Sequence, residues 1–345
     1  MKLSLQHFDL PTRRPFTISR GTTTVQSTLI VELQQDGVCG YGEAPAVSYY
    51  NATIECLTRW IERARPLLEA TPAEDPVVLW DRLHTTFGDA TFAQSAVDLA
   101  AWDLWGKLQG APVWKLWGLS LEDLPLSDYT ISIDTPEGML GRLAEFPDWP
   151  VYKIKLGTPD DVAMVRRLRQ ETDAVLRVDA NGAWTAEQTI RNAAVLQELG
   201  VELIEQPLPT AEWQAMERVY RESALPLVAD ESCRVEPHVD RCVGQFHGIN
   251  IKLPKCGGLT PARRMIARAR QLGLKVMVGC FTESSVGISA AAQLLPLVDY
   301  ADLDGALLLA EDIATGVTID HGRVHFPEEN GCVPFFAGRG FAINE

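Results

Sequence analysis

The chain has 345 residues, of which 46% are hydrophobic and 22% are charged, values typical of a folded globular protein. This length allows one large domain with a smaller companion. The formal net charge of -15 comes from 46 acidic residues against 31 basic ones. Because such an acidic surface repels nucleic acid and anionic membranes, neither is expected as a partner.

Targeting and redox features point to the cytoplasm. The start of the chain, MKLSLQHFDL, lacks a long apolar core with a cleavage site, and no apolar stretch approaches the roughly 20 residues of a membrane helix. The seven cysteines are scattered without a C-x-x-C pair, as expected for reduced thiols. The six histidines show no spacing typical of a zinc site, such as H-E-x-x-H. We therefore expect a cytoplasmic protein whose metal ligands are carboxylates.

The first part of the chain, residues 1–122, is predicted to be an α+β unit. Residues 25–34 and 38–44 are typical of two strands around Asp36-Gly37, a pair of residues suited to a tight hairpin. Residues 51–70 and 90–108 carry the spacing of amphipathic helices.

Residues 123–316 show a different sequence pattern, in which short apolar runs alternate with helical segments about every 20 to 27 residues. This pattern is typical of β-α repeats around a parallel sheet. Eight runs are expected to be strands: 129–133, 151–156, 174–180, 201–207, 225–231, 248–253, 274–279 and 299–305. Eight such strands favour a TIM-like barrel over an open sheet. Residues 317–345 are irregular and are expected to return to the N-terminal unit.

Three acidic residues end consecutive predicted strands. Asp179, Glu205 and Asp230 are spaced 26 and 25 residues apart, one β-α unit each, so the strands would deliver three carboxylates to one point at the C-terminal face of the barrel. Oxygen ligands without histidine or thiolate suit Mg2+. The alternative is three unrelated acids that are satisfied by arginines or helix N-termini.

Three lysines lie at strand ends as well. Lys153 and Lys155 are two residues apart, so both side chains face the barrel interior. Lys252 ends the sixth strand, roughly across the barrel mouth. Two lysines on opposite sides of a substrate would provide a base and an acid for proton transfer. The alternative is that they only neutralise the acidic cluster.

At this point several motifs resemble one family. The segments spread over nearly the whole chain, and they are GYGEAPAVSYYNAT (40–53), AVDLAAWDLWGKLQGAPVWKLWG (96–118), KIKLG (153–157), RVDANGAW (177–184), IEQPLP (204–209), ADES (229–232), NIKLPKCGG (250–258) and VGCFTES (278–284). They are similar to the enolase superfamily, in particular its muconate-lactonising subgroup. The resemblance implies a modified TIM barrel, (β/α)7β, with an α+β capping domain formed by residues 1–122 and the C-terminal segment.

The resemblance also implies roles for the strand-end residues. Asp179, Glu205 and Asp230 would bind Mg2+, and Lys155 and Lys252 would be the two acid/base lysines. Lys153 would hold the substrate carboxylate and help to neutralise an enolate. Lys255 lies close to Lys252, but the strand-end position of the family's base matches Lys252.

Other residues are expected to bind the substrate. Asp302 and Asp304 in YADLDG look like the D-x-D pair with which dipeptide epimerases bind the α-ammonium of a dipeptide, and two inward carboxylates are a good receptor for an ammonium group. The alternative is a solvated acidic turn. Arg20, in a segment similar to that of L-Ala-D/L-Glu epimerases, would bind a side-chain carboxylate. Further contacts are expected at Thr130, Cys280 and Thr282.

These features predict a Mg2+-dependent dipeptide epimerase that moves the α-proton of the C-terminal residue, with L-Ala-D/L-Glu as the expected substrate. Alternatives that would use the same apparatus are o-succinylbenzoate synthase and muconate cycloisomerase, whose substrates offer no ammonium group for Asp302 and Asp304. From another class, a non-catalytic binding protein on the same barrel remains open. A homo-oligomer is expected only by analogy with relatives.

Overall fold

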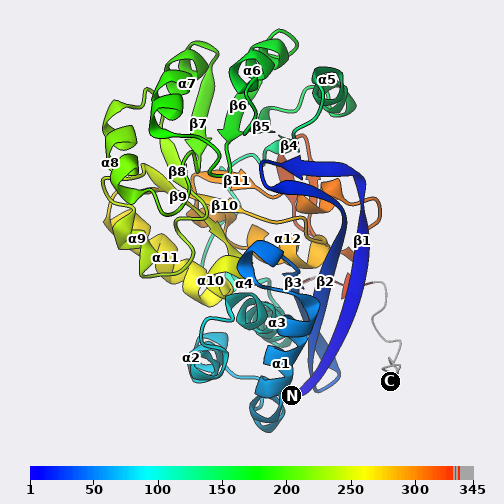
Figure 1. Cartoon of the computed structure of the whole chain (residues 1–345). Coiled ribbons are helices and arrows are strands. Elements are labelled where there is room, and N and C mark those ends of the chain that lie inside the picture. The colour runs from blue at the N-terminus through cyan, green and yellow to red at the C-terminus, as the bar shows by residue number, and fades with distance from the viewer. Residues whose placement is uncertain (329–330, 332, 335–345) are drawn as a thin grey trace.

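A computed structural model of the chain describes residues 1–328, 331 and 333–334. A parallel sheet rolled into a barrel lies beside a cap of antiparallel sheet and helices (Figure 1). Within the described residues, no helix is long and apolar enough to cross a membrane. The cap elements are β1 (Lys2–Ile18), β2 (Gly21–Gln35), β3 (Val38–Pro45), α1 (Ile54–Ala70), α2 (Pro76–Phe87), α3 (Thr91–Gln109) and α4 (Val113–Leu116).

The cap sheet has the order β1-β2-β3, so β2 is its central strand. The predicted hairpin is confirmed: Asp36 and Gly37 join β2 to β3 with φ values of 52° and 80°. Strand β1 was not anticipated. It is an edge strand whose register shifts between Pro11 and Phe16, and prolines at an edge interrupt the alternation by which strands are recognised.

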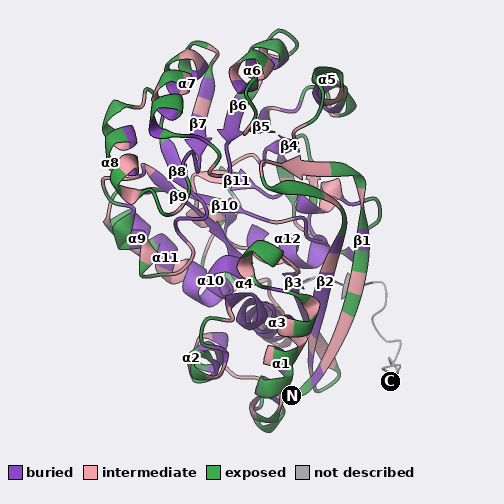
Figure 2. Ribbon diagram, in the orientation of Figure 1, coloured by how far each residue is buried: buried purple, intermediate pink, exposed green. Residues whose placement is uncertain are grey.

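Two cap helices were expected and a third was not. Helices α1 and α3 match the predicted segments within three residues at each end. The unanticipated helix, α2, begins with Pro76 at its first position, and the Asp75 side chain accepts a hydrogen bond from Val77 N. Figure 2 shows α3 as the most deeply buried helix of the cap. It lies so close to β3 that a Cβ atom on Gly42 would be 2.0 Å from Ala96 O.

The barrel contains the eight predicted strands, each within its expected range. The strands are β4 (Tyr129–Ile131), β5 (Val151–Lys155), β6 (Val175–Asp179), β7 (Val201–Glu205), β8 (Leu227–Ala229), β9 (Gly248–Lys252), β10 (Lys275–Gly279) and β11 (Tyr300–Asp302). The connecting helices are α5 (Pro136–Glu145), α6 (Asp161–Arg169), α7 (Ala186–Glu198), α8 (Trp213–Glu222), α9 (His238–Arg241), α10 (Leu253–Cys256), α11 (Leu259–Gln271) and α12 (Ser285–Ala292). Neighbouring strands are consecutive in sequence, and a parallel bridge between Ser127 and Ala301 closes the ring.

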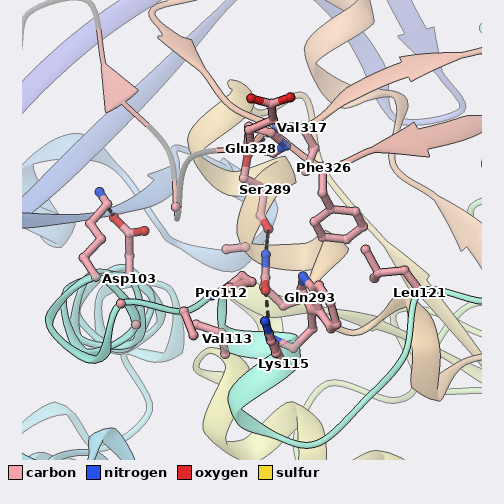
Figure 3. A pocket seen from close by; sticks show the side chains of 18 of the residues that line it. Asp103, Pro112, Val113, Lys115, Leu121, Ser289, Gln293, Val317, Phe326 and Glu328 are labelled. Atoms are coloured by element: carbon pink, nitrogen blue, oxygen red, sulfur yellow. Dashed lines mark hydrogen bonds and ion pairs between the residues drawn. The ribbon is translucent and has the colours of Figure 1, made fainter.

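Polar contacts join the cap to the barrel. Helix α3 supplies Asp98, whose carboxylate accepts hydrogen bonds from Thr260 N (3.0 Å) and Thr260 Oγ1 (2.7 Å) at the start of α11. Gln293, just after α12, bridges in the same way: it accepts from Trp114 N at 3.0 Å and donates to Ser289 O at 3.1 Å (Figure 3). These buried and partly buried contacts fix the cap against the barrel, so loops of the cap can serve as walls of a site at the barrel mouth.

The C-terminal segment contains short strands, which are β12 (Ala314–Thr315), β13 (Thr318–Asp320), β14 (Arg323–His325) and β15 (Val333–Pro334). Strand β12 pairs with β15, and β13 pairs with β14. Gly322, in the turn between β13 and β14, accepts a hydrogen bond from Ser127 N at the base of the barrel. Part of the predicted return to the cap, residues 329–330, 332 and 335–345, lies outside the described residues. The domain boundaries stay predictions.

Candidate active site

Three carboxylates meet at the C-terminal face of the barrel. Asp179 ends β6, Glu205 ends β7 and Asp230 follows β8, and each offers an oxygen atom that lies within 4.8 Å of the other two. All three residues are buried. Their even spacing along the chain therefore translates into a common point in space, and this acidic cluster could hold a metal ion.

The chemistry of the cluster fits a hard cation. Burial raises the pKa of Glu205 to about 7; Lys153 opposes the shift, whereas Asp179 and Asp230 reinforce it. Glu205 Oε2 also makes no hydrogen bond with the residues that the structure describes, although it forms an ion pair with Lys153 Nζ at 2.6 Å. Three buried oxygen donors that repel one another, without histidine or thiolate among them, suit a divalent metal of the Mg2+ type.

Two lysines reach the cluster from different strands. Lys155 Nζ, on β5, is 2.6 Å from Asp179 Oδ2, and Lys252 Nζ, at the end of β9, is 3.0 Å from Asp230 Oδ2. Burial disfavours the charged form of Lys252, but Asp230, Glu205 and Asp302 together outweigh it and raise the pKa of the ammonium group. Both lysines line one cavity at the barrel mouth, as their strand-end positions predict.

Two other lysines lie deeper. Lys153 shares the inward face of β5 with Lys155, and its Nζ contacts Glu205 and Asp302, both at 2.6 Å. It does not line the cavity. Lys255 is fully buried and donates to Asp230 O at 2.7 Å and Asn250 O at 3.1 Å. Lys255 is therefore a buried ion-pair partner of Asp230, whereas Lys252 lines the cavity.

The aspartates of β11 are buried rather than solvated, so the surface-turn interpretation is wrong: Asp302 is 4% exposed and Asp304 is 2% exposed. Thr130 N donates to Asp304 Oδ2 at 2.6 Å. Burial, reinforced by Asp302, raises the pKa of Asp304 to about 7. Burial also favours the neutral form of Asp302, but Lys153, Lys155 and Lys252 together outweigh it and lower the pKa of Asp302. Both aspartates line the same cavity as the two lysines.

This cavity has a volume of about 530 Å3 and brings together the predicted substrate-binding residues other than Lys153. Thr130, Cys280, Thr282 and Arg20 all line it. The Arg20 guanidinium is already paired: Nη2 is 2.6 Å from Glu231 Oε1, and Nη1 donates to Asn181 O at 2.8 Å. A different cavity, between α4, α12 and the C-terminal segment (Figure 3), contains none of the three clustered carboxylates.

Several residues of the site were not assigned a role from the sequence. Asn250 Nδ2 donates to Glu205 Oε1 at 2.7 Å and orients it. Glu231 follows Asp230 directly and holds Arg20. Tyr50 of the cap lines the cavity opposite the strands. Asn250 and Glu231 are polar residues at the ends of apolar strand segments, and this pattern could have identified them. Tyr50 lies in the motif of residues 40–53, but no periodic pattern indicates that its side chain reaches the cavity.

An eight-stranded barrel with a carboxylate cluster and two flanking lysines under an α+β cap defines the class of enolase-like enzymes. Comparison of the sequence with models of known protein families supports the same class. Residues 3–118 match the mandelate racemase/muconate lactonizing enzyme N-terminal domain, and residues 142–333 match the enolase C-terminal domain-like family. The chain therefore belongs to the enolase superfamily, in the mandelate racemase/muconate lactonizing enzyme group.

The most informative relatives within this family are dipeptide epimerases. An L-Ala-D/L-amino acid epimerase of Flavobacterium johnsoniae is 49% identical over 96% of this chain and 98% of its own length. One of Maribacter sp. is 50% identical, with the same coverage of both chains. A dipeptide epimerase of Cytophaga hutchinsonii, solved with Mg and D-Ala-L-Val, has a TM-score of 0.90 at 26% identity and covers 96% of this chain and 95% of that one.

Proposed function

We propose that this chain is a Mg2+-dependent dipeptide epimerase that inverts the α-carbon of the C-terminal residue of an L-Ala dipeptide. The main support is geometric: Lys155 and Lys252 line one cavity but are held by different carboxylates of the cluster, Asp179 and Asp230. Inversion requires a proton to leave one face of the carbon and another to arrive at the opposite face. Two separately anchored amines meet that requirement.

Asp179, Glu205 and Asp230 are the proposed metal ligands. Bound Mg2+ would supply a Lewis acid that stabilises negative charge as it develops on a substrate carboxylate. Lys155 and Lys252 would exchange roles according to the epimer bound, one accepting the α-proton while the other, as an ammonium, donates a proton to the opposite face. Asp302 and Asp304 would bind the substrate ammonium, which distinguishes a dipeptide from a wholly anionic substrate.

The residues around Arg20 bear on which side chains the cavity accepts at the C-terminal residue of the dipeptide substrate. Arg20 was expected to bind the carboxylate of a glutamate residue, but Glu231 already pairs with its guanidinium at 2.6 Å. The cavity wall also carries Phe16, Ile18 and Leu308. We therefore propose that L-Ala-L-Glu is one of several substrates and that dipeptides with uncharged side chains are accepted as well, in the manner of an L-Ala-D/L-amino acid epimerase.

Proton exchange in heavy water tests this proposal. The protein with Mg2+ is incubated with L-Ala-L-Glu and, separately, L-Ala-L-Leu, and loss of the C-terminal α-proton is followed by NMR. Exchange with inversion is the expected result. No exchange with any member of an L-Ala dipeptide library would reject the epimerase, and exchange by Lys252→Ala on both epimers would reject the two-base assignment.

A further inference from the structure

A second cavity, about 390 Å3 in volume, lies in the cap beside the active-site cavity. Its wall is formed by the N-terminal half of α1, the connection between α2 and α3, and Arg234, which comes from the barrel after β8. Tyr50 lines both cavities and forms the boundary between them. The metal-type cluster, the lysines and the aspartate pair are not part of this second wall.

Three arginines surround this cavity without carboxylate partners among the described residues. Arg59 and Arg63 are four residues apart on α1, so they lie on one helix face, where like charges are mutually unfavourable. Neither forms an ion pair with a described residue: Arg59 Nη2 donates to Cys56 Sγ at 3.3 Å, and Arg63 stacks on the Trp60 ring. The neighbouring acid Glu62 is engaged elsewhere, since its two oxygens accept from Arg65 at 2.6 and 2.7 Å.

The third arginine faces the first two from the barrel side. The guanidinium of Arg234 stacks on the Tyr50 ring at 4.8 Å, and no described residue forms a hydrogen bond with its buried Nε. Asp89 is the single acid among the described residues that line the cavity, and its side chain is exposed. The cavity wall is thus net positive on a chain whose formal net charge is -15, which marks it as a place where an anion is attracted.

Helix α3 contributes a second feature of an anion site. This helix of 19 residues begins in the wall of the cavity, and Ala90, at its N-cap, offers no side-chain acceptor. The N–H groups of Phe92 and Ala93 have no hydrogen-bond partner among the described residues. Thr91 is 9% exposed, and within the described part of the chain its hydroxyl also has no hydrogen-bond partner. Free N–H groups at the positive end of a helix favour bound anions.

We propose that this cap cavity binds a small oxyanion, that is, a phosphate or carboxylate group, between the arginines of α1, Arg234 and the N-terminus of α3. The shape of the guanidinium group suits either oxyanion, because both accept two parallel hydrogen bonds. The site is separate from the proposed reaction centre. It meets the active site at Tyr50, whose ring lies 5.9 Å from that of Phe281 and is the surface on which Arg234 stacks.

Isothermal titration of the Mg2+-loaded protein with inorganic phosphate, and in a second arm with succinate, tests the proposal at constant ionic strength. Saturable binding of at least one anion at one site per chain is expected. The double variant R59A/R63A should weaken that binding at least tenfold, and R59K/R63K should retain most of it. The matched control is Arg191→Ala, an exposed arginine of α7 that forms no ion pair within the described part of the chain.

Two outcomes of the titration would contradict the proposal. If neither anion binds with a Kd below ~10 mM, the cavity is not an oxyanion site. If an anion binds equally to wild type and R59A/R63A, it occupies another place, such as the active-site lysines, and the assignment is rejected. Far-UV circular dichroism and the thermal midpoint in chloride establish that the double variant is folded. The outcome does not depend on epimerase activity.

Discussion

Lys153 Nζ lies 2.6 Å from Asp302 Oδ2, and this buried ion pair connects the carboxylate cluster of β6–β8 with the aspartate pair of β11. The same ammonium group is 2.6 Å from Glu205 Oε2. Burial disfavours its charge, but Asp302 and Glu205 outweigh burial and hold the pKa of Lys153 well above its usual value. Lys153 is therefore a buried cation that pairs with both the carboxylate cluster and the aspartate pair.

Replacing that cation should cost both stability and activity. Lys153→Met leaves Glu205 and Asp302 buried without their partner, and breaking a buried pair in this way typically destabilises a protein by about 3–5 kcal/mol. We expect a loss of this size in urea unfolding and turnover reduced at least 100-fold. In a double-mutant cycle with Asp302→Asn, the two stability losses should not add. Full additivity would contradict the coupling.

The proposed ammonium receptor can be tested with a blocked substrate. Asp304→Asn keeps the acceptor for Thr130 N but removes a charge, so kcat/KM for a free L-Ala dipeptide should fall by roughly 10-fold to 100-fold, corresponding to about 1.4–2.7 kcal/mol. The N-acetylated dipeptide, which has no ammonium, should be turned over poorly by both proteins and show little difference between them. An equal fall for both substrates would assign Asp304 to a structural role.

Mg2+ should stabilise the folded chain through the carboxylate cluster. A ligand at 100 times its Kd contributes about 2.7 kcal/mol to the free energy of unfolding, so addition of Mg2+ should raise Tm and a chelator should reverse the rise. Asp179→Asn should abolish the response. Asp161→Asn is the control, because Asp161 is also buried but accepts from Gly157 N and Trp184 Nε1 instead. A Mg2+ response preserved in the Asp179 variant would place the metal elsewhere.

Asp98 gives a pH dependence that is separate from the active site. Burial raises its pKa to about 7, against the hydrogen bonds from Thr260. The folded-state pKa of Asp98 is above its unfolded value of 3.8. At pH values between the two, the folded state therefore binds more protons than the unfolded state, and stability falls as pH rises from about 4 to about 7. The ionisation would cost up to about 4 kcal/mol.

Asp98→Asn imitates the protonated carboxyl group and should remove this contribution. Urea titration at pH 5 and pH 8 measures the unfolding free energy of wild type and of D98N. The stability of D98N relative to wild type should be greater at pH 8 than at pH 5. Comparison of the two proteins cancels the effect of the other titrating groups. A difference that does not change with pH would contradict the raised pKa of Asp98.

The sequence was most informative where a residue type recurs at a fixed interval. Asp179, Glu205 and Asp230 follow the period of the β-α repeat, and parallel strands bring equivalent positions to one face, so their convergence could be foreseen. The inward direction of Lys153 and Lys155 follows from the two-residue period of a strand. Strand β1 and helix α2 were not predicted, because prolines in β1 break the alternation and because the start of α2 is marked only locally, by Asp75 and Pro76.

Local periodicity was sufficient to predict the barrel, its acidic cluster and the strand-end lysines, because it fixes which strand ends share a face. The position of Lys153 outside the cavity wall, the pairing of Glu231 with Arg20, and the place of Tyr50 in the walls of two cavities emerge only in the folded structure. These relationships join residues far apart along the chain. They depend on how the cap packs against the barrel, and no periodic pattern encodes that packing.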